Sequence, residues 1–186
     1  MNSMPAQTKT DCRINATVGF SINTENIKIS LLSIADKALY LQLYCNAQVC
    51  RHIGGAISSD QATIGFERSL KQNRVGKRLT WVIKDKNRNE NLGIAACVWP
   101  KKPSSETDLV SKYSAELGLL LLPQFCGKGV AVEVLNALTF FGLNNLQLTQ
   151  LTLTCAVDNI AMQKVMGKLA FAYQSNNDLT YWELRD

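Results

Sequence analysis

The sequence predicts one domain of the α/β (α+β) class, with a mixed, mostly antiparallel central sheet flanked by helices. Its length of 186 residues and its hydrophobic content of 46% suffice for one complete core. Apolar runs typical of strands alternate along the chain with apolar residues at helical spacing. Two β-rich runs, 79–85 and 92–99, are joined by the polar segment KNRNEN, which indicates an antiparallel hairpin.

The first half of the chain predicts a strand and two helices before this hairpin. The run IKISLL (27–32) alternates like a strand. Ser33 offers an N-cap to a helix over 34–50, whose apolar spacing continues until a glycine pair stops it. The capping segment SSD then introduces a second helix over 61–74.

The second half predicts strands and helices in alternation, after an exposed loop over 100–113. The expected elements are strand 115–122, helix 130–146, strand 151–157, helix 159–171 and strand 180–185. The complete order is therefore βααβββαβαβ. Such an order is that of a mixed α/β sheet.

The first 25 residues are polar and predict a loose N-terminal arm, which places the folded domain at 26–186. They contain neither a signal-peptide pattern nor a run long enough to cross a bilayer, so a cytoplasmic protein without membrane contact is expected. The six cysteines form no CxxC pair and are interpreted as reduced, structural residues. The single histidine, His52, is interpreted as a surface or packing residue, and no metal site is expected.

Much of the net charge of +5 comes from basic residues in the middle of the chain. They are Lys71, Arg74, Lys77, Arg78, Lys84, Lys86 and Arg88. A solvated helix end and hairpin is the favoured interpretation, and a patch for anions is the alternative. Because aromatic residues are not interleaved with these bases, nucleic-acid binding is disfavoured.

The segment LPQFCGKGVAVE, residues 122–133, joins an apolar strand to an amphipathic helix through two glycines. Such a junction presents unpaired backbone N–H groups at the positive end of the helix. Gly127 and Gly129 leave room for an anion to approach the backbone, and Lys128 adds a positive charge. An anion site and a helix cap without ligand both agree with this pattern. Neither the Walker pattern GxxxxGK[ST] nor the dinucleotide pattern GxGxxG is present.

The stretches AELGLLLLPQFCGKGVAVEVLNAL and LTLTCAVDNIAMQKVMGKLAF resemble the GNAT N-acetyltransferase superfamily, and within it the ribosomal-protein N-acetyltransferase (RimJ/RimL-like) branch. The resemblance covers the element order from about residue 26 to the C-terminus and is specific over 115–171. It implies the acyl-CoA N-acyltransferase fold and acetyl-CoA as co-substrate. The implied function is direct transfer of an acetyl group to a primary amine, either a protein N-terminus or a small-molecule amine.

The resemblance assigns the pyrophosphate of coenzyme A to a turn of the pattern [Q/R]xxGx[G/A]. The matching residues are Cys126, Gly127, Lys128, Gly129, Val130 and Ala131. Cys126 departs from the pattern, because Gln or Arg usually occupies its place. Backbone amides do most of the phosphate binding in such a turn, so cofactor binding is still expected.

The resemblance also implies that the strand before this turn splays from the next strand, so that the pantetheine arm bonds to its backbone. The edge would be formed by Leu119, Leu120, Leu121 and Leu122. Asn159 matches an asparagine whose amide bonds the pantetheine or orders the site. A helix N-cap supplied by Asp158 or Asn159 is the alternative, and the two roles are compatible.

Glu116, in AELG, resembles the carboxylate of this branch, which takes the proton of the amine directly or through a water. A strand-end glutamate facing solvent is the alternative that the residues alone allow. A backbone N–H near Leu119 or Leu120 would face the thioester oxygen as the oxyanion donor.

The proton donor for the departing thiolate is missing from its usual places. Met162 stands where this branch often has serine, and Met166 where other acetyltransferases have tyrosine. Neither methionine can donate a proton, which leaves water, Tyr173 or Tyr181. A CoA-binding protein of the same fold, with little or no catalysis, is therefore the alternative function.

The acceptor amine has no motif in the sequence. It is expected to contact residues 51–56, between the first two helices, and the loop over 100–113. The sequence leaves a homodimer open.

Overall fold

The computed structural model describes residues 21–100, 113–169, 172–176 and 179–185. The elements in chain order are β1 (Ser21–Asn23), β2 (Ile27–Leu31), the 3-10 helix η1 (Ile34–Asp36), α1 (Lys37–Tyr44), α2 (Ala47–Cys50), α3 (Ser59–Arg74), β3 (Arg78–Asp85), β4 (Asn91–Val98), β5 (Ser114–Leu121), the 3-10 helix η2 (Pro123–Phe125), α5 (Val130–Asn144), β6 (Gln150–Ala156), α6 (Ile160–Met166), β7 (Ala172–Asn176) and β8 (Leu179–Arg185).

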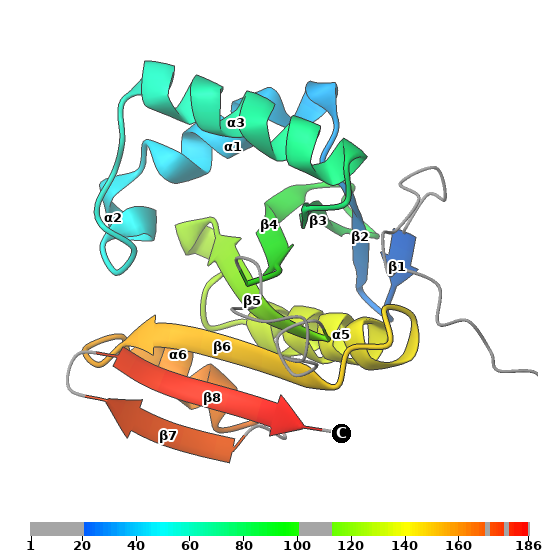
Figure 1. Ribbon diagram of the computed structural model, residues 1–186. Helices are drawn as coiled ribbons and strands as arrows, with labels where there is room; N and C mark the ends of the chain where they lie inside the picture. Colours follow the sequence, from blue (N-terminus) through cyan, green and yellow to red (C-terminus); the bar gives the residue numbers. More distant parts are fainter. Residues whose placement is uncertain (1–20, 101–112, 170–171, 177–178, 186) are drawn as a thin grey trace, which may run out of the picture.

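The strands form one sheet in the order β1-β2-β3-β4-β5-β6-β8-β7 (Figure 1). Among the described residues, β5 and β6 are the parallel pair, and every other neighbouring pair is antiparallel. The parallel pair needs a crossover connection, which α5 provides. The mixed, mostly antiparallel sheet and the β3–β4 hairpin expected from the sequence are therefore confirmed.

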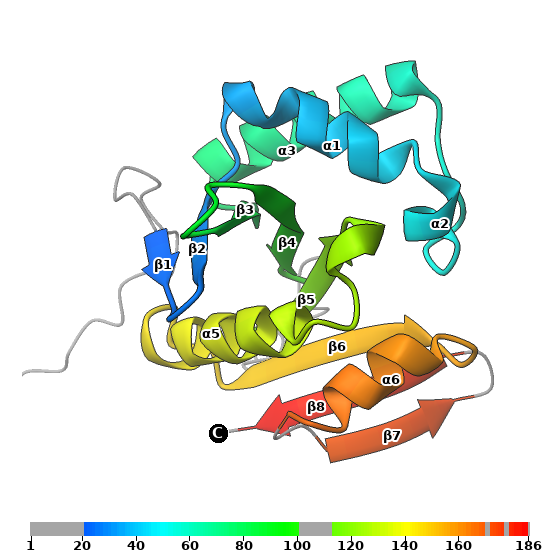
Figure 2. The same ribbon diagram turned by 180° about the vertical axis from the view of Figure 1, so that it is seen from behind.

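Helices cover both faces of the sheet. Figure 1 shows α1 and α3 on one side of it, and Figure 2 shows α5 and α6 on the other. Trp81 of β3 packs edge-on against Phe141 of α5, with ring centroids 6.1 Å apart. Because side chains alternate along a strand, the neighbouring Thr80 and Val82 face α1 and α3. Both are buried, so each face of β3 has its own helical cover.

A large part of the core lies between the sheet and α5. Its buried side chains include Trp81, Leu117, Leu135, Leu138 and Leu153. Each such aliphatic side chain contributes about 1.5–3 kcal/mol on leaving water. The core thus fixes β5 and the first turns of α5 relative to each other, and the junction between them carries the site described below.

One of the two helices predicted in the first half is confirmed, and the other is divided. Ser58 and Gln61 form a reciprocal capping box at the start of α3, with hydrogen bonds of 3.1 and 3.2 Å. The helix predicted over 34–50 is wrong as a single element, because α1 ends at Tyr44. The side chain of Asn46 then accepts hydrogen bonds from the N–H groups two and three residues further on, which begins α2 as a new helix.

The two ends of the domain also differ from the prediction. Residues 21–23 pair with β2 as β1, so the arm predicted over 1–25 is wrong at its C-terminal end. The helix predicted over 159–171 ends at Met166, because Gly167, a poor helix former, follows. An unpredicted strand, β7, then pairs with β8.

The described cysteines are free thiols. They are Cys45, Cys50, Cys97, Cys126 and Cys155. Burial raises the pKa of the Cys97 thiol to about 12, so this thiol stays protonated. No helix among the described residues is long and apolar enough to span a membrane. Residues 101–112 of the predicted loop lie outside the described residues.

Gly93 in β4 and Gly118 in β5 give a matched test of how closely these strands approach. A Cβ at Gly93 would lie 2.1 Å from the Leu120 carbonyl oxygen, whereas a Cβ at Gly118 would meet no atom within 4 Å. Gly93→Ala should therefore destabilise the domain by about 1–3 kcal/mol, the usual effect of overpacking. Thermal unfolding should show a lower midpoint for Gly93→Ala than for Gly118→Ala. Equal midpoints would contradict the close approach.

Candidate functional site

The strands β5 and β6 separate partway along their length. Parallel pairing joins residues 114–117 of β5 to residues 150–153 of β6 and then stops, although both strands continue. Beyond that point, the described partner of β5 is β4, and that of β6 is β8. Figure 1 shows the two strands diverging toward their C-terminal ends. We call this opening, which begins at Gly118, the split.

Strand geometry decides which backbone groups of β5 face the split. The Leu122 N–H donates to the Leu92 carbonyl at 2.9 Å, so the amide of Leu122 points toward β4. Because backbone groups alternate sides along a strand, Leu120 also points toward β4, whereas Leu119 and Leu121 point into the split. Of the edge predicted over Leu119–Leu122, only Leu119 and Leu121 therefore present backbone groups to the split. Of the two predicted oxyanion donors, Leu119 and Leu120, only the Leu119 N–H faces it.

The turn between β5 and α5 depends on two glycines with left-handed backbone. Gly127 has a φ of 76°, and Gly129, the N-cap of α5, has a φ of 83°. Other residues rarely adopt this conformation. A Cβ at either glycine would meet no atom within 4 Å, so the space beside the turn is free.

The same turn leaves a run of backbone donors without partners. The Glu133 N–H donates to the Gly129 carbonyl at 3.1 Å. From residue 127 to residue 132, which includes Val130 and Ala131, the N–H groups have no backbone acceptor in the described part of the chain. Free N–H groups at the positive end of a helix are the geometry that an anion site requires.

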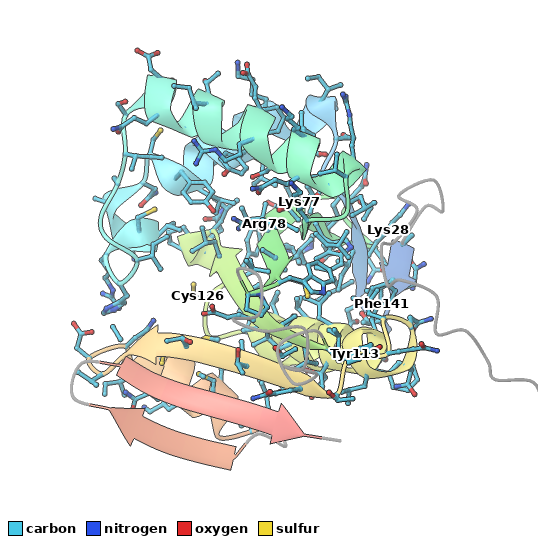
Figure 3. The ribbon with its side chains drawn as sticks, in the orientation of Figure 1. Lys28, Lys77, Arg78, Tyr113, Cys126 and Phe141 are labelled. Atoms are coloured by element: carbon cyan, nitrogen blue, oxygen red, sulfur yellow. The ribbon has the colours of Figure 1, made fainter. Side chains whose placement is uncertain are left out.

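Cys126 and Lys128 flank the first glycine of this turn. Both are exposed, and Figure 3 labels Cys126 on the segment between β5 and α5. Partial burial of its side chain nevertheless raises the pKa of the Cys126 thiol, and the positive charge of Arg51 opposes this rise. The Lys128 Nζ lies 5.8 Å from the centroid of the Phe125 ring, within the range of a cation–π contact. The turn thus carries the cation of Lys128 and is subject to the positive charge of Arg51.

Glu116 is exposed where the pairing of β5 and β6 is about to end. Its cross-strand partners are Val98 of β4 and Thr152 of β6. These three residues, with Trp99, line a hollow of about 350 Å³. Pockets for small molecules begin at about this size. A carboxylate therefore stands at the closed end of the split, on the wall of a hollow that can admit a small amine.

The register of the sheet fixes the face on which Glu116 lies. Trp81 faces α5 and is the cross-strand partner of Ala95, which pairs in turn with Leu119. Since cross-strand partners share a face, the Leu119 side chain also faces α5. Glu116, three residues earlier, lies on the opposite face, which α1 and α3 partly cover. The carboxylate is therefore reached from the face of the sheet that carries α1 and α3.

Asn159 and the two methionines lie on or next to α6. The Asn159 Oδ1 accepts a hydrogen bond from the Met162 N–H at 3.1 Å, so Asn159 rather than Asp158 caps this helix. Met166 is fully buried, and Met162 is half-buried against the core. The face that these methionines share therefore packs into the core.

His52 takes part in polar contacts that sequence reasoning missed. The Arg51 Nε donates to His52 Nε2 at 2.8 Å, and His52 Nδ1 lies 3.1 Å from Asp158 Oδ1. These contacts link the residues after α2 to the loop between β6 and α6. The interpretation of His52 as a surface or packing residue did not include these contacts. No motif marks these contacts, because their partners are far apart in the sequence.

A family model described as an acetyltransferase (GNAT) domain matches residues 26–172. The match spans the described elements from β2 to α6 and reaches the first residue of β7. It therefore includes the split, the glycine turn and Glu116. A comparison of the sequence with curated proteins finds no match.

Solved structures of acetyltransferases share this fold at low sequence identity. A GNAT-family acetyltransferase from Bacillus anthracis has a TM-score of 0.74 and 17% identity, over 89% of this chain and 98% of its own. A structure described as RimL, a ribosomal L7/L12 alpha-N-protein acetyltransferase in complex with coenzyme A, has a TM-score of 0.74 and 15% identity, over 89% and 98%. A spermidine N-acetyltransferase from Vibrio cholerae, in complex with CoA and spermine, has a TM-score of 0.72 and 16% identity, over 87% and 96%.

Proposed function

This chain belongs to the GNAT acetyltransferase family and is an acetyl-CoA-dependent N-acetyltransferase, and we propose that Glu116, Leu119 and the turn over 126–131 bring about its transfer reaction. The observation that carries this proposal is the position of Glu116, exposed beside the point where β5 and β6 separate. The proposed base, Glu116, therefore lies next to the strand edge that Leu119 and Leu121 present to the split, because all three residues belong to β5.

The free backbone groups of the chain fit coenzyme A at two places. The N–H groups of residues 127–132 can bind the diphosphate, and the free space beside the two glycines lets it approach them. In the split, Leu119 and Leu121 offer groups with which an extended pantetheine arm can pair as an added strand would. Asn159 caps α6 through Oδ1, which leaves its Nδ2 for the same arm. When bound, acetyl-CoA supplies the activated thioester.

Acetyl transfer needs a neutral amine, a polarised carbonyl group and a proton for the thiolate. Glu116 takes the proton of the amine, directly or through a water, as the nitrogen attacks the carbonyl carbon. The Leu119 N–H donates to the carbonyl oxygen as negative charge develops there. The amide bond forms and the carbon–sulfur bond breaks. A thiol with a pKa of about 8.5, by analogy with cysteine, can leave as the thiolate and take its proton from water, so no acid on α6 is required.

The acceptor is a primary amine small enough for its nitrogen to enter the hollow beside Glu116. The RimL structure is named for a protein N-terminus as acceptor, and the Vibrio cholerae enzyme for spermidine. Both classes place a primary amine on a slender chain, which fits a hollow of about 350 Å³. Peptide N-termini and polyamines are therefore the two acceptor classes proposed for this chain.

A panel of amines tests this function, with release of free CoA as the measurement. Peptides with varied N-terminal residues and polyamines should be assayed at saturating acetyl-CoA. We expect one class to accelerate CoA release well above its rate without amine, and mass spectrometry to show one added acetyl group. Binding of CoA without turnover on any amine would instead indicate a CoA-binding protein with little or no catalysis, and would contradict the roles given to Glu116 and Leu119.

A further inference from the structure

Three side chains form a polar bridge at the open end of the split. The bridge consists of Arg51, His52 and Asp158, joined by contacts of 2.8 and 3.1 Å. Arg51 and His52 follow α2, whereas Asp158 follows the C-terminal end of β6. Figures 1 and 2 show the loop after α2 and the loop after β6 at the same end of the molecule. The polar bridge therefore joins the helical layer to β6 where β5 and β6 have already separated.

The hydrogen bonds define the role of each group in the polar bridge. Arginine donates and never accepts, so His52 Nε2 must be the acceptor and carries no proton. The proton of the imidazole then lies on Nδ1, which donates to the Asp158 carboxylate. His52 is thus a neutral linker that holds the guanidinium through Nε. The two terminal nitrogens of Arg51, whose side chain is exposed, keep their N–H groups for another partner.

The polar bridge places Arg51 at the open end of the split, where the turn that follows β5 also lies. The positive charge of Arg51 lowers the pKa of the Cys126 thiol in this turn, against the opposing effect of burial, although the two residues come from different elements. Cys126 directly precedes Gly127, where the run of N–H groups without backbone acceptors begins. Lys128 is the basic residue of the turn itself, and its Nζ lies near the Phe125 ring. Arg51 therefore brings a second positive charge to the end of the split at which these N–H groups lie.

We propose that Arg51 binds the diphosphate of coenzyme A, and that His52 and Asp158 position its guanidinium. A guanidinium binds phosphate oxygens through two parallel hydrogen bonds, which makes arginine well suited to this ligand. The turn supplies backbone N–H groups from the α5 side, and Arg51 supplies side-chain N–H groups from the α2 side. Cys126 carries no positive charge, so Arg51 supplements Lys128 as a cation for the diphosphate. This inference rests on the proposed cofactor site and adds a residue from outside the turn.

Binding of three ligands to the full chain tests the assignment of Arg51. Arg51→Met should raise the Kd for coenzyme A about 10- to 100-fold, the range expected for hydrogen bonds to a charged group. Dephospho-CoA keeps the diphosphate and should lose affinity equally, whereas pantetheine lacks it and should bind both proteins equally well. Arg51→Lys keeps the charge but lacks the planar pair of donors. Its Kd for CoA should therefore lie between those of the parent and of Arg51→Met. Calorimetry gives the affinities, and thermal unfolding reports whether each variant is folded.

The control is Arg74→Met, which removes the same charge from the last turn of α3, at the other end of that helix from the α2–α3 loop. Its CoA affinity should stay near that of the parent. An equal loss for pantetheine in Arg51→Met would mean that Arg51 only supports the loop, and would overturn the proposal. A loss for CoA but not for dephospho-CoA would assign Arg51 to the 3′-phosphate instead. Unchanged CoA affinity in Arg51→Met would also overturn the proposal for Arg51. The proposed cofactor site at the turn would still stand in that case, provided that the parent binds CoA.

Two variants of His52 test its positioning role. Glutamine can accept from Arg51 and donate to Asp158 as His52 does, whereas leucine can do neither. His52→Leu should raise the Kd for CoA and dephospho-CoA about 3- to 10-fold, the range for one hydrogen bond, and leave pantetheine unaffected. His52→Gln should bind all three ligands nearly as the parent does. The same loss in both variants would show that the polar bridge does not position Arg51.

Discussion

Gly129→Glu should raise the Kd for coenzyme A by roughly 100-fold or more, because it places a carboxylate where the diphosphate is proposed to bind. Gly129 is the N-cap of α5, and a Cβ added to it would meet no protein atom within 4 Å. The positive end of the helix would then attract the new carboxylate in place of the ligand. Calorimetric titration with CoA measures the loss, and acetyl transfer at low acetyl-CoA should fall in parallel.

Gly129→Ala separates the effect of the carboxylate from that of the backbone. Both substitutions place a Cβ on a residue with a φ of 83°, which destabilises the folded chain by about 1–2 kcal/mol in either case. The two variants should therefore unfold at similar temperatures, while the alanine variant keeps most of its affinity for CoA. Equal CoA affinity in the two variants would mean that the diphosphate lies elsewhere, and would remove the turn from the cofactor site.

The parts of the fold that could be predicted from the sequence are those with local signals. Alternating apolar residues and the polar KNRNEN segment define the β3–β4 hairpin, and the capping box at Ser58 defines the start of α3. The break between α1 and α2 could not be predicted, because the apolar residues keep their helical spacing on both sides of Asn46, the residue that caps α2. The strand β7 has the polar sequence AYQSN, and its pairing with β8 rather than its own residues makes it a strand.

The candidate site likewise has features that a local sequence signal predicts and features that depend on contacts between distant residues. A turn with Gly127 and Gly129 could be predicted because left-handed backbone favours glycine, and a resemblance to acetyltransferases drew attention to Glu116. The polar bridge could not be predicted, because His52 and Asp158 meet only after the loop after α2 and the end of β6 are placed together. The choice of Leu119 over Leu120 as the oxyanion donor likewise needed the register between β4 and β5.

Glu116→Gln should lower the rate of acetyl transfer by roughly 10²- to 10⁴-fold, the usual contribution of a positioned base. Glutamine keeps the size and polarity of this exposed side chain but cannot take a proton. CoA affinity should change little, because Glu116 lies on the face of the sheet opposite to the Leu119 side chain and does not belong to the turn. A rate assay with free CoA as the readout, beside calorimetry on the same preparation, measures the two effects separately. Glu67→Gln, at an exposed position of α3, is the matched control and should leave both unchanged.

The pH dependence of Glu116→Gln distinguishes a base from a charge that merely attracts the acceptor. Without the base, only amine already deprotonated by the solvent reacts, so the rate of the variant should rise about tenfold per pH unit up to the pKa of the amine. That pKa is about 7.7–8.0 for a peptide N-terminus and about 10.4 for an alkyl amine. The deficit relative to the parent should therefore shrink as the pH rises, and it should be smaller for the peptide N-terminus at the same pH. A deficit that stays constant with pH and is equal for both amines would mean that Glu116 binds the ammonium group without taking its proton. Equal rates for parent and variant would remove Glu116 from the reaction, since no proton would then pass through this position.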